Sequence, residues 1–234
     1  MQKYKIAIVG SGIIGMTLAL QLSTINHINI TLFGKKPKYS EFKTTAILAT
    51  SFDIYKRLLN LNESHPQISK LKKFKIIDEL KTKKKIIDFD AAEINLDSFA
   101  YNVRDNFLAD RLHKEIKNNT AIIFKNEFIE GLEDNLSKTI LNTSDGAEEF
   151  DLVIGADGGR SSVRHLSAIE GEATDYHQHC IVGTLKIRGH HHQQAWQRFL
   201  PTGPLGLLPL VGPYYSLAWS VDTSSVTALM DLSE

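Results

Sequence analysis

The sequence contains two glycine-rich segments whose spacing could hold a dinucleotide, and residues 10–15 (GSGIIG) form the first. Gly10, Gly12 and Gly15 match a GxGxxG pattern. In such a turn the first glycine permits a tight bend, the second lets the backbone approach a pyrophosphate, and the third allows close helix-to-sheet packing. The start of the following helix also favours an anionic ligand. We therefore expect this turn to bind the diphosphate of a cofactor.

The second segment, residues 155–164 (GADGGRSSVR), follows an apolar run at 152–154 and matches the pattern GADGxxSxxR. Asp157 supplies a carboxylate that can bind the hydroxyl groups of an extended cofactor. Ser161, Val163 and Arg164 then open the next segment. A ten-residue match of this kind is more specific than the first motif.

An alternative ligand is suggested by the end of the second expected strand. Dinucleotide folds usually carry an acidic residue there, which binds the adenosine ribose. This sequence has Gly34 at that place, followed by Lys35 and Lys36. Basic residues could accept a ribose phosphate, which favours NADP, whereas residues 155–164 argue against a nicotinamide cofactor at this site.

Hydrophobic periodicity predicts the elements that position these motifs. Apolar runs at 5–9 and 28–33 flank a helical stretch at 16–22, which is a βαβ opening. Further helices are expected at 45–61 and 105–116, and a lysine-rich hairpin at 71–89. The helix at 45–61 should bury Ile47, Leu48, Phe52, Leu58 and Leu59. Short strands are expected at 122–124, 128–129, 139–141, 151–155, 181–187 and 214–221.

Composition narrows the function classes. The chain has 234 residues, 42% of them hydrophobic, and its 27 basic and 27 acidic residues cancel, so nucleic-acid binding is not expected. A single cysteine, Cys180, excludes an internal disulfide and fits a reducing cytoplasm. The chain has no secretory signal pattern and no run of about 18 apolar residues. We expect a cytoplasmic protein whose membrane contact is at most peripheral.

With its two glycine motifs in this order, the sequence resembles the class A flavoprotein monooxygenases, the family of the aromatic-ring hydroxylases. Residues 195–210 (AWQRFLPTGPLGLLPL) resemble the RF-x-P-x-GP-x-x-x-LPL signature of the ubiquinone-biosynthesis hydroxylases within that family. Residues 43–48 (KTTAIL) also resemble their R-x-x-AL segment, with Lys43 in place of arginine. The resemblance implies an α/β fold, in which a Rossmann-like FAD-binding domain precedes a mixed-sheet substrate domain.

The same resemblance implies the cofactors and the residues that bind them. FAD would be the bound cofactor, NAD(P)H the electron donor, and dioxygen and a polyprenyl phenol the substrates. Gly10, Gly12 and Gly15 would hold the FAD diphosphate, and Lys43 would make a second contact to it. The remaining expected cofactor residues are Asp157, Gly158 and Arg164, the last in a motif that also meets the nicotinamide donor. No catalytic side chain can be assigned.

The resemblance also predicts that this chain is incomplete. Relatives carry a later GDAAH-type segment that nothing here matches, so we expect an FAD-binding domain at 1–172 and an incomplete substrate domain at 173–234. A second chain supplying the other half, a truncation and a decayed gene are all open explanations. The alternatives to a hydroxylase are a catalytically silent fragment or subunit, and an NAD(P)H- or FAD-linked reductase on the same fold.

A histidine cluster and a lysine cluster give weaker indications of function. His190, His191 and His192 suggest metal ligands, but three consecutive residues cannot face one ion from a regular strand, so no metal site is expected. Lysines between Lys70 and Lys85 predict a solvated hairpin face. Such a face could also contact an acidic partner or anionic lipid, the latter placing the chain at the inner membrane with its polyprenylated substrate, and it predicts salt-sensitive binding to anionic vesicles.

Overall fold

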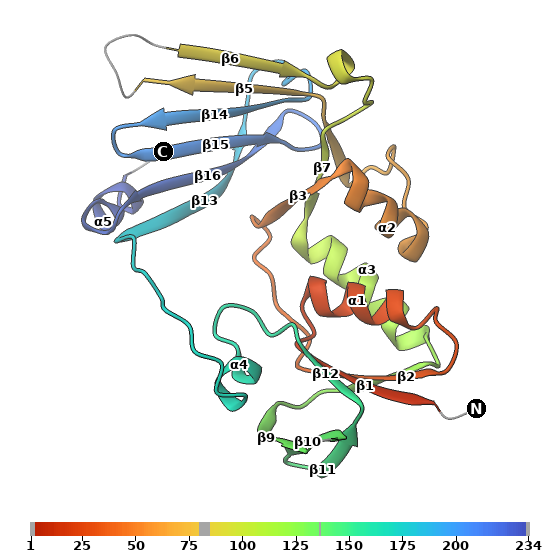
Figure 1. The fold of residues 1–234 in the computed structure, drawn as a ribbon. Helices are drawn as coiled ribbons and strands as arrows, with labels where there is room; N and C mark the ends of the chain where they lie inside the picture. The colour runs from red at the N-terminus through yellow and green to blue at the C-terminus, as the bar shows by residue number, and fades with distance from the viewer. Residues whose placement is uncertain (1–2, 80–84, 136, 233–234) are drawn as a thin grey trace. The chain divides into compact units, whose positions relative to one another are not determined.

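The computed structural model describes residues 3–79, 85–135 and 137–232 (Figure 1). Contacts divide the chain into two compact units. The first unit contains residues 1–39 and 108–172, and the second contains residues 40–107 and 173–234. Within the described residues, no helix has the length and apolar character needed to cross a membrane.

A four-stranded parallel sheet forms the centre of the first unit. Its strand order is β12 (Leu152–Gly155), β1 (Tyr4–Val9), β2 (Ile28–Phe33) and β8 (Ile122–Lys125). Side chains alternate between the faces of a strand, so Ile8 and Val9 point to opposite sides, and both are buried. Burial on both faces explains why β1 is a continuous apolar run. Helix α1 (Ile13–Leu22) follows β1, and helix α3 (Asp105–Asn118) precedes β8.

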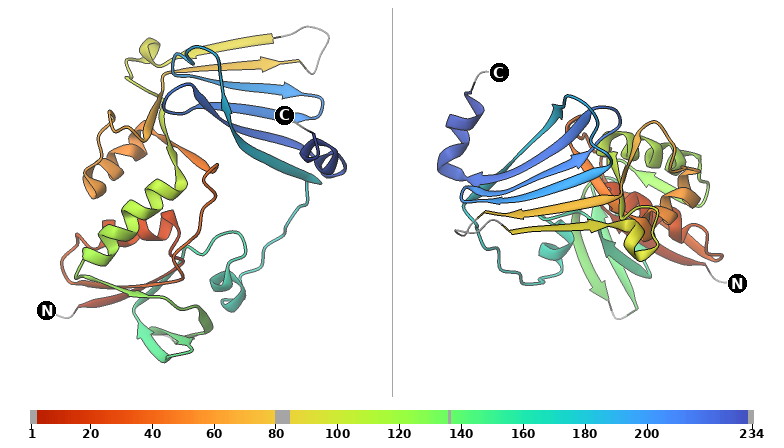
Figure 2. Two further views of the ribbon diagram at one scale, coloured as in Figure 1. Left: turned by 180° about the vertical axis from the view of Figure 1, so that it is seen from behind. Right: turned by 90° about the horizontal axis from the view of Figure 1, so that it is seen from above.

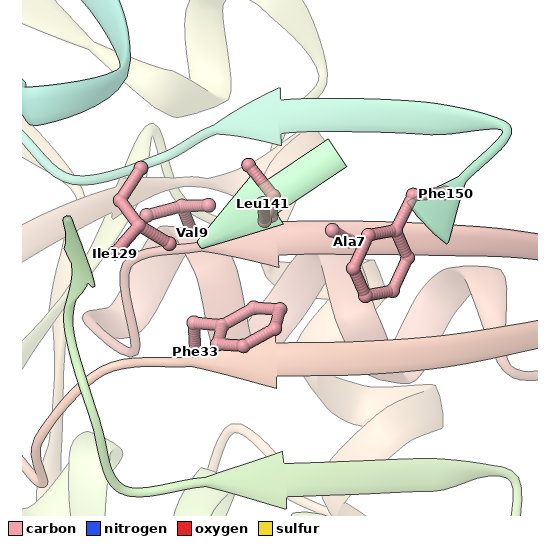
Figure 3. Close-up of a cluster of buried hydrophobic side chains, with 6 residues drawn as sticks. All are labelled: Ala7, Val9, Phe33, Ile129, Leu141 and Phe150. Carbon is pink, nitrogen blue, oxygen red and sulfur yellow. The ribbon is translucent and has the colours of Figure 1, made fainter. Parts of the chain in front are cut away.

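A small antiparallel sheet completes the core of the first unit. Its strands are β9 (Ile129–Asn135), β10 (Lys138–Thr143) and β11 (Gly146–Phe150), and α4 (Ser162–Leu166) comes later in the chain. Figure 3 shows six side chains from this sheet and from β1 and β2 gathered in one cluster. The rings of Phe33 and Phe150 meet edge to face, with centroids 5.8 Å apart. This cluster fixes the loops that follow β1 and β2.

The second unit is built on a six-stranded mixed sheet. Its order is β13 (Gln178–Lys186), β16 (Tyr214–Asp222), β15 (Gly203–Pro209), β14 (Gln194–Leu200), β5 (Lys73–Asp78) and β6 (Lys85–Asp90). A three-stranded sheet contains β3 (Thr44–Leu48), β7 (Ala100–Arg104) and β4 (Ile68–Leu71). The remaining elements are α2 (Ala49–Leu59), α5 (Val226–Met230) and the 3₁₀ turns η1 (Ala91–Ile94) and η2 (Thr223–Ser225).

The α/β fold with a parallel sheet and a second, mixed sheet is confirmed, but the chain is not divided at a single point. Segment 40–107 groups with 173–234 because β5 lies beside β14 (Figure 2). The two strands pair in parallel, with Phe74 opposite Ala195. Residues 40–107, which we expected within the 1–172 domain, therefore belong to the second unit, and that unit is discontinuous in sequence.

The helix predicted over 45–61 is wrong in its first turn. Thr44–Leu48 form β3, which pairs antiparallel with β7, and the helix runs from Ala49 to Leu59. The β-branched residues of β3 favour extended backbone, which outweighed the helical spacing. Leu48, which we expected on the buried face, is 64% exposed, whereas Phe52 and Leu59 are buried as predicted. The helix predicted at 105–116 is confirmed as α3.

Candidate functional site

The two glycine-rich segments meet at one cavity of about 360 Å³ in the first unit. β1 and β12 are parallel neighbours, with Val9 opposite Gly155, so the loops that follow them leave the same edge of the sheet. The cavity is lined by residues from 9–12, 33–35, 127–129 and 156–162. Ligands of open α/β sheets bind in this position, beyond the carboxyl ends of the strands.

The first turn is so tightly packed that two of its glycines have no room for a side chain. A Cβ on Gly10, whose φ is +114°, would lie 2.3 Å from the Ala156 carbonyl oxygen, and one on Gly15 would lie 1.8 Å from the Gly10 carbonyl oxygen. Gly12 differs, because the nearest described protein atom to its Cβ would be the Tyr39 hydroxyl, at 3.6 Å. Gly10 and Gly15 are therefore required by packing, while Gly12 keeps the cavity wall free of a side chain.

The second turn is held by side-chain hydrogen bonds. Asp157 Oδ1 accepts a bond of 2.6 Å from the Ser161 hydroxyl, and its Oδ2 accepts one of 3.1 Å from the Val163 amide. Ser161 caps α4 by accepting from the Arg164 amide, and the Arg164 guanidinium donates to the Gly159 carbonyl at 2.8 Å. Asp157 thus shapes the turn with both oxygens, although a carboxylate has further lone pairs for a ligand.

The structure brings some of the expected cofactor residues together and separates others. Gly10, Gly12, Asp157 and Gly158 line the cavity, and Gly15 packs beneath it against Gly10.

Two expected residues do not line this cavity. The Arg164 guanidinium is engaged by the loop itself. Lys43 belongs to the second unit, where its Nζ lies 4.0 Å from Asp105 Oδ2. Cofactor contacts by Arg164 and Lys43 stay predictions.

Sequence reasoning missed two charged residues that line the cavity, Arg160 and Glu127. Arg160 lies inside the second motif, at a position that the pattern leaves free. Glu127 lies two residues beyond β8, and its side chain is 12% exposed. β8 is the parallel neighbour of β2, so its end meets the same sheet edge, and this pairing, which the sequence alone does not reveal, brings Glu127 to the cavity.

The two lysines that suggested a ribose phosphate have protein partners. Lys36 Nζ lies 2.9 Å from Asp110 Oδ1. Lys35 lines the cavity, and its ammonium lies 5.0 Å from the centre of the Phe128 ring, a cation–π arrangement. Lys36 is therefore engaged by α3, and Lys35 is the one of the pair that can meet a ligand in this cavity.

The histidine and lysine clusters lie in the second unit. His191 Nε2 is 2.7 Å from the Leu210 carbonyl oxygen, and no described group of three His, Cys, Asp or Glu residues is arranged to hold a metal ion. Lys73 and Lys75 pair across strands with Asp90 and Asp88, at 3.1 and 3.2 Å. The expected hairpin turn, with Lys81, Lys83 and Lys84, lies outside the described residues.

Comparison with known proteins agrees with the geometry of this cavity. The family described as FAD binding domain matches residues 3–198. The chain is 25% identical over 260 residues to the ubiquinone biosynthesis monooxygenase COQ6 of Homo sapiens and 26% identical over 254 residues to the 3-demethoxyubiquinol 3-hydroxylase of Escherichia coli. Each match covers 99% of this chain, which spans 54% and 61% of the lengths of these two relatives.

Solved structures show the same fold at low sequence identity. PqsL, a probable FAD-dependent monooxygenase from Pseudomonas aeruginosa, matches 98% of this chain and 63% of its own, with a TM-score of 0.78 and 16% identity. HpxO of Klebsiella pneumoniae, solved with FAD and uric acid, matches 93% and 56%, with a TM-score of 0.71 and 15% identity. The chain is therefore similar to flavin-dependent monooxygenases that include ubiquinone-biosynthesis hydroxylases, and it belongs to the FAD binding domain family.

Proposed function

We propose that this chain is the FAD-binding part of an NAD(P)H- and oxygen-dependent hydroxylase that acts on a polyprenyl phenol in ubiquinone biosynthesis. The observation that carries the proposal is the meeting of two glycine turns at one cavity, in a chain whose curated relatives include two ubiquinone-biosynthesis oxygenases.

The residues of the cavity suit FAD. The backbone of Gly10 and Gly12 offers close approach to the diphosphate, and the Arg160 side chain can balance its charge. Asp157, already held by Ser161 and Val163, is pre-oriented to accept hydrogen bonds from cofactor hydroxyls. When bound, FAD supplies the oxygen chemistry, and the protein contributes binding and orientation.

An apolar cavity in the second unit supports a hydrophobic substrate. It has a volume of about 350 Å³ and lies at β3, β4, β5, β6, β7 and β15. Every lining residue is apolar, with Leu48, Phe74, Phe89 and Leu208 among the largest. We propose that these side chains bind the apolar part of the polyprenyl phenol, because burying such a group releases water at no hydrogen-bonding cost.

The proposed substrate also bears on where the chain acts. A polyprenylated substrate resides in the bilayer, so we propose that the chain acts at the surface of the inner membrane. β6 supports this, because its Ile86, Ile87 and Phe89 are 51%, 52% and 46% exposed. Lys73 and Lys75 of this hairpin are paired with carboxylates, so we propose that the exposed apolar residues carry the contact, and we expect vesicle binding that persists as salt is raised.

We propose that the full reaction also uses groups from the region of the relatives that this chain does not span, since the chain covers 54% and 61% of two of them. We propose that the same polypeptide or a second chain supplies them.

The first experiment is a titration of the chain with FAD and, separately, with FMN, followed by flavin fluorescence. We expect saturable FAD binding and weak FMN binding, because the described cavity residues address the diphosphate, which FMN lacks. Equal affinity for both flavins would contradict this use of the cavity.

Turnover measurements then distinguish a hydroxylase from a catalytically silent subunit and from a reductase. NADH or NADPH oxidation is measured under air with a short-chain polyprenyl phenol, and hydroxylated product is determined by mass spectrometry. Hydroxylated product supports the proposal. FAD binding without NAD(P)H oxidation favours a catalytically silent subunit, and NAD(P)H oxidation with an artificial electron acceptor but no hydroxylation favours a reductase.

A further inference from the structure

The cavity lacks an acidic side chain at the place where dinucleotide folds usually bind the adenosine ribose. β2 ends at Phe33, and the next residue is Gly34, with φ of +136°. A Cβ at this position would lie 2.8 Å from the Ser11 hydroxyl oxygen and 2.9 Å from the Ser11 amide nitrogen. An aspartate or glutamate could not occupy position 34 unless the first glycine turn moved.

A different carboxylate reaches the same cavity from the neighbouring strand. β8 runs parallel to β2, with Lys125 opposite Phe33, so residues just beyond Lys125 emerge beside Gly34. Glu127 is one of these residues, and it lines the cavity together with Gly12 and Gly34.

Glu127 has one unused acceptor. Its side chain is 12% exposed, and its Oε2 is buried without a hydrogen-bond partner among the described residues. Its Oε1 lies 3.6 Å from Lys125 Nζ. Lys125 is bonded more closely to Glu148, and that hydrogen bond is the main reason why the pKa of Lys125 lies above its usual value. A buried carboxylate oxygen without a donor is unfavourable, and a ligand hydroxyl would supply the donor.

We propose that Glu127 binds the ribose hydroxyls of the adenosine half of FAD and replaces the acidic residue that β2 lacks. This inference rests on the FAD site proposed above. It also assigns a selectivity to the cavity: the carboxylate of Glu127 accepts hydrogen bonds from a free ribose diol, but it repels a 2′-phosphate. Lys35 alone would favour a 2′-phosphate. Glu127 is therefore the residue that makes the cavity prefer the free ribose of FAD over the 2′-phosphorylated ribose of NADP.

The test compares two glutamates that share Lys125. Glu127→Gln removes the charge in the cavity, while the control Glu148→Gln weakens the pairing of Lys125 without changing a lining residue. FAD affinity is measured by flavin fluorescence. We expect Glu127→Gln to bind about ten-fold more weakly, equivalent to about 1.4 kcal/mol, and Glu148→Gln to stay within about two-fold of wild type. Equal affinities in the two variants would overturn the proposal.

A second measurement uses the wild-type chain, so it does not depend on how a variant folds. An FAD analogue that lacks the adenosine 2′- and 3′-hydroxyls should bind wild type about ten-fold more weakly than FAD. 5′-AMP should displace FAD at lower concentration than 2′,5′-ADP, which differs from it only by the 2′-phosphate, and Glu127→Gln should narrow that difference. If wild type binds FAD and the analogue equally, Glu127 does not bind the ribose and the FAD site stands. If wild type binds neither, the FAD site itself is overturned.

Discussion

The two glycine turns of the cavity are built by opposite means, although both follow a parallel strand at the same sheet edge. In the first, Gly10 and Gly15 are required because backbone atoms fill the space that their side chains would take. In the second, Gly158 and Gly159 have no atom within 4 Å of an added Cβ, and hydrogen bonds of Asp157, Ser161 and Arg164 hold the shape. One turn depends on the absence of side chains, and the other depends on their presence.

This difference indicates which substitutions affect folding and which affect binding. Close packing leaves no way to relax, so a change there costs stability first. A polar network can lose one bond and keep the others, so a change there should reduce stability and binding by moderate amounts.

The largest effect is expected from Gly15→Ala. Its Cβ would lie 1.8 Å from the Gly10 carbonyl oxygen, so α1 must move away from the turn. We expect a loss of more than about 4 kcal/mol of unfolding free energy, with loss of FAD binding as a consequence. Urea denaturation followed by circular dichroism measures it. A near-native midpoint would show that the first turn is not closely packed.

Gly12→Ala should separate binding from folding within the same turn. The backbone here is extended, with φ of −70°, and the Tyr39 hydroxyl at 3.6 Å is an ordinary contact, so the unfolding free energy should change by less than about 1 kcal/mol. The new methyl group enters the cavity wall, and FAD affinity should fall by more than about ten-fold. An FAD titration beside the same urea experiment checks both. Unchanged affinity would mean that the diphosphate lies elsewhere.

Asp157→Ala is expected to have an intermediate effect. It leaves the Ser161 hydroxyl and the Val163 amide without their acceptor, so the chain should lose about 1–3 kcal/mol. FAD binding should weaken as well. Ser161→Ala is the matched control, because it loosens the turn but keeps the carboxylate. If Ser161→Ala weakens FAD binding as much as Asp157→Ala does, Asp157 acts through the shape of the turn and not by direct contact.

The sequence was sufficient to predict the elements around the cavity. It was insufficient to predict which elements pair when they are far apart in the chain. β1, α1 and β2 were predictable because an apolar run, a glycine turn and a helical stretch follow one another locally. The pairing of β5 with β14 joins segments more than a hundred residues apart, and a single sequence carries no sign of it. The discontinuous second unit was missed for this reason.

Within the site, the residues that belong to motifs were predictable and Glu127 was not. Gly10, Gly12 and Asp157 lie at fixed spacings that reflect local geometry. Glu127 reaches the cavity because β8 happens to lie beside β2, which is a tertiary fact. The internal role of Asp157 could have been anticipated, since a carboxylate four residues before Ser161 and six before Val163 is placed to bond the start of the next helix.

The smallest effects are expected within the second turn, where two adjacent glycines separate backbone strain from packing. An alanine side chain would meet no atom within 4 Å at Gly158 or at Gly159, but Gly158 has φ of +87° and Gly159 is outside the positive-φ region. Gly158→Ala should therefore cost about 1–2 kcal/mol from strain alone, whereas Gly159→Ala should be neutral or stabilising by about 0.5 kcal/mol, because alanine reduces the freedom of the unfolded chain. Paired urea titrations measure the difference. Equal costs would mean that the positive φ of Gly158 does not strain an alanine there.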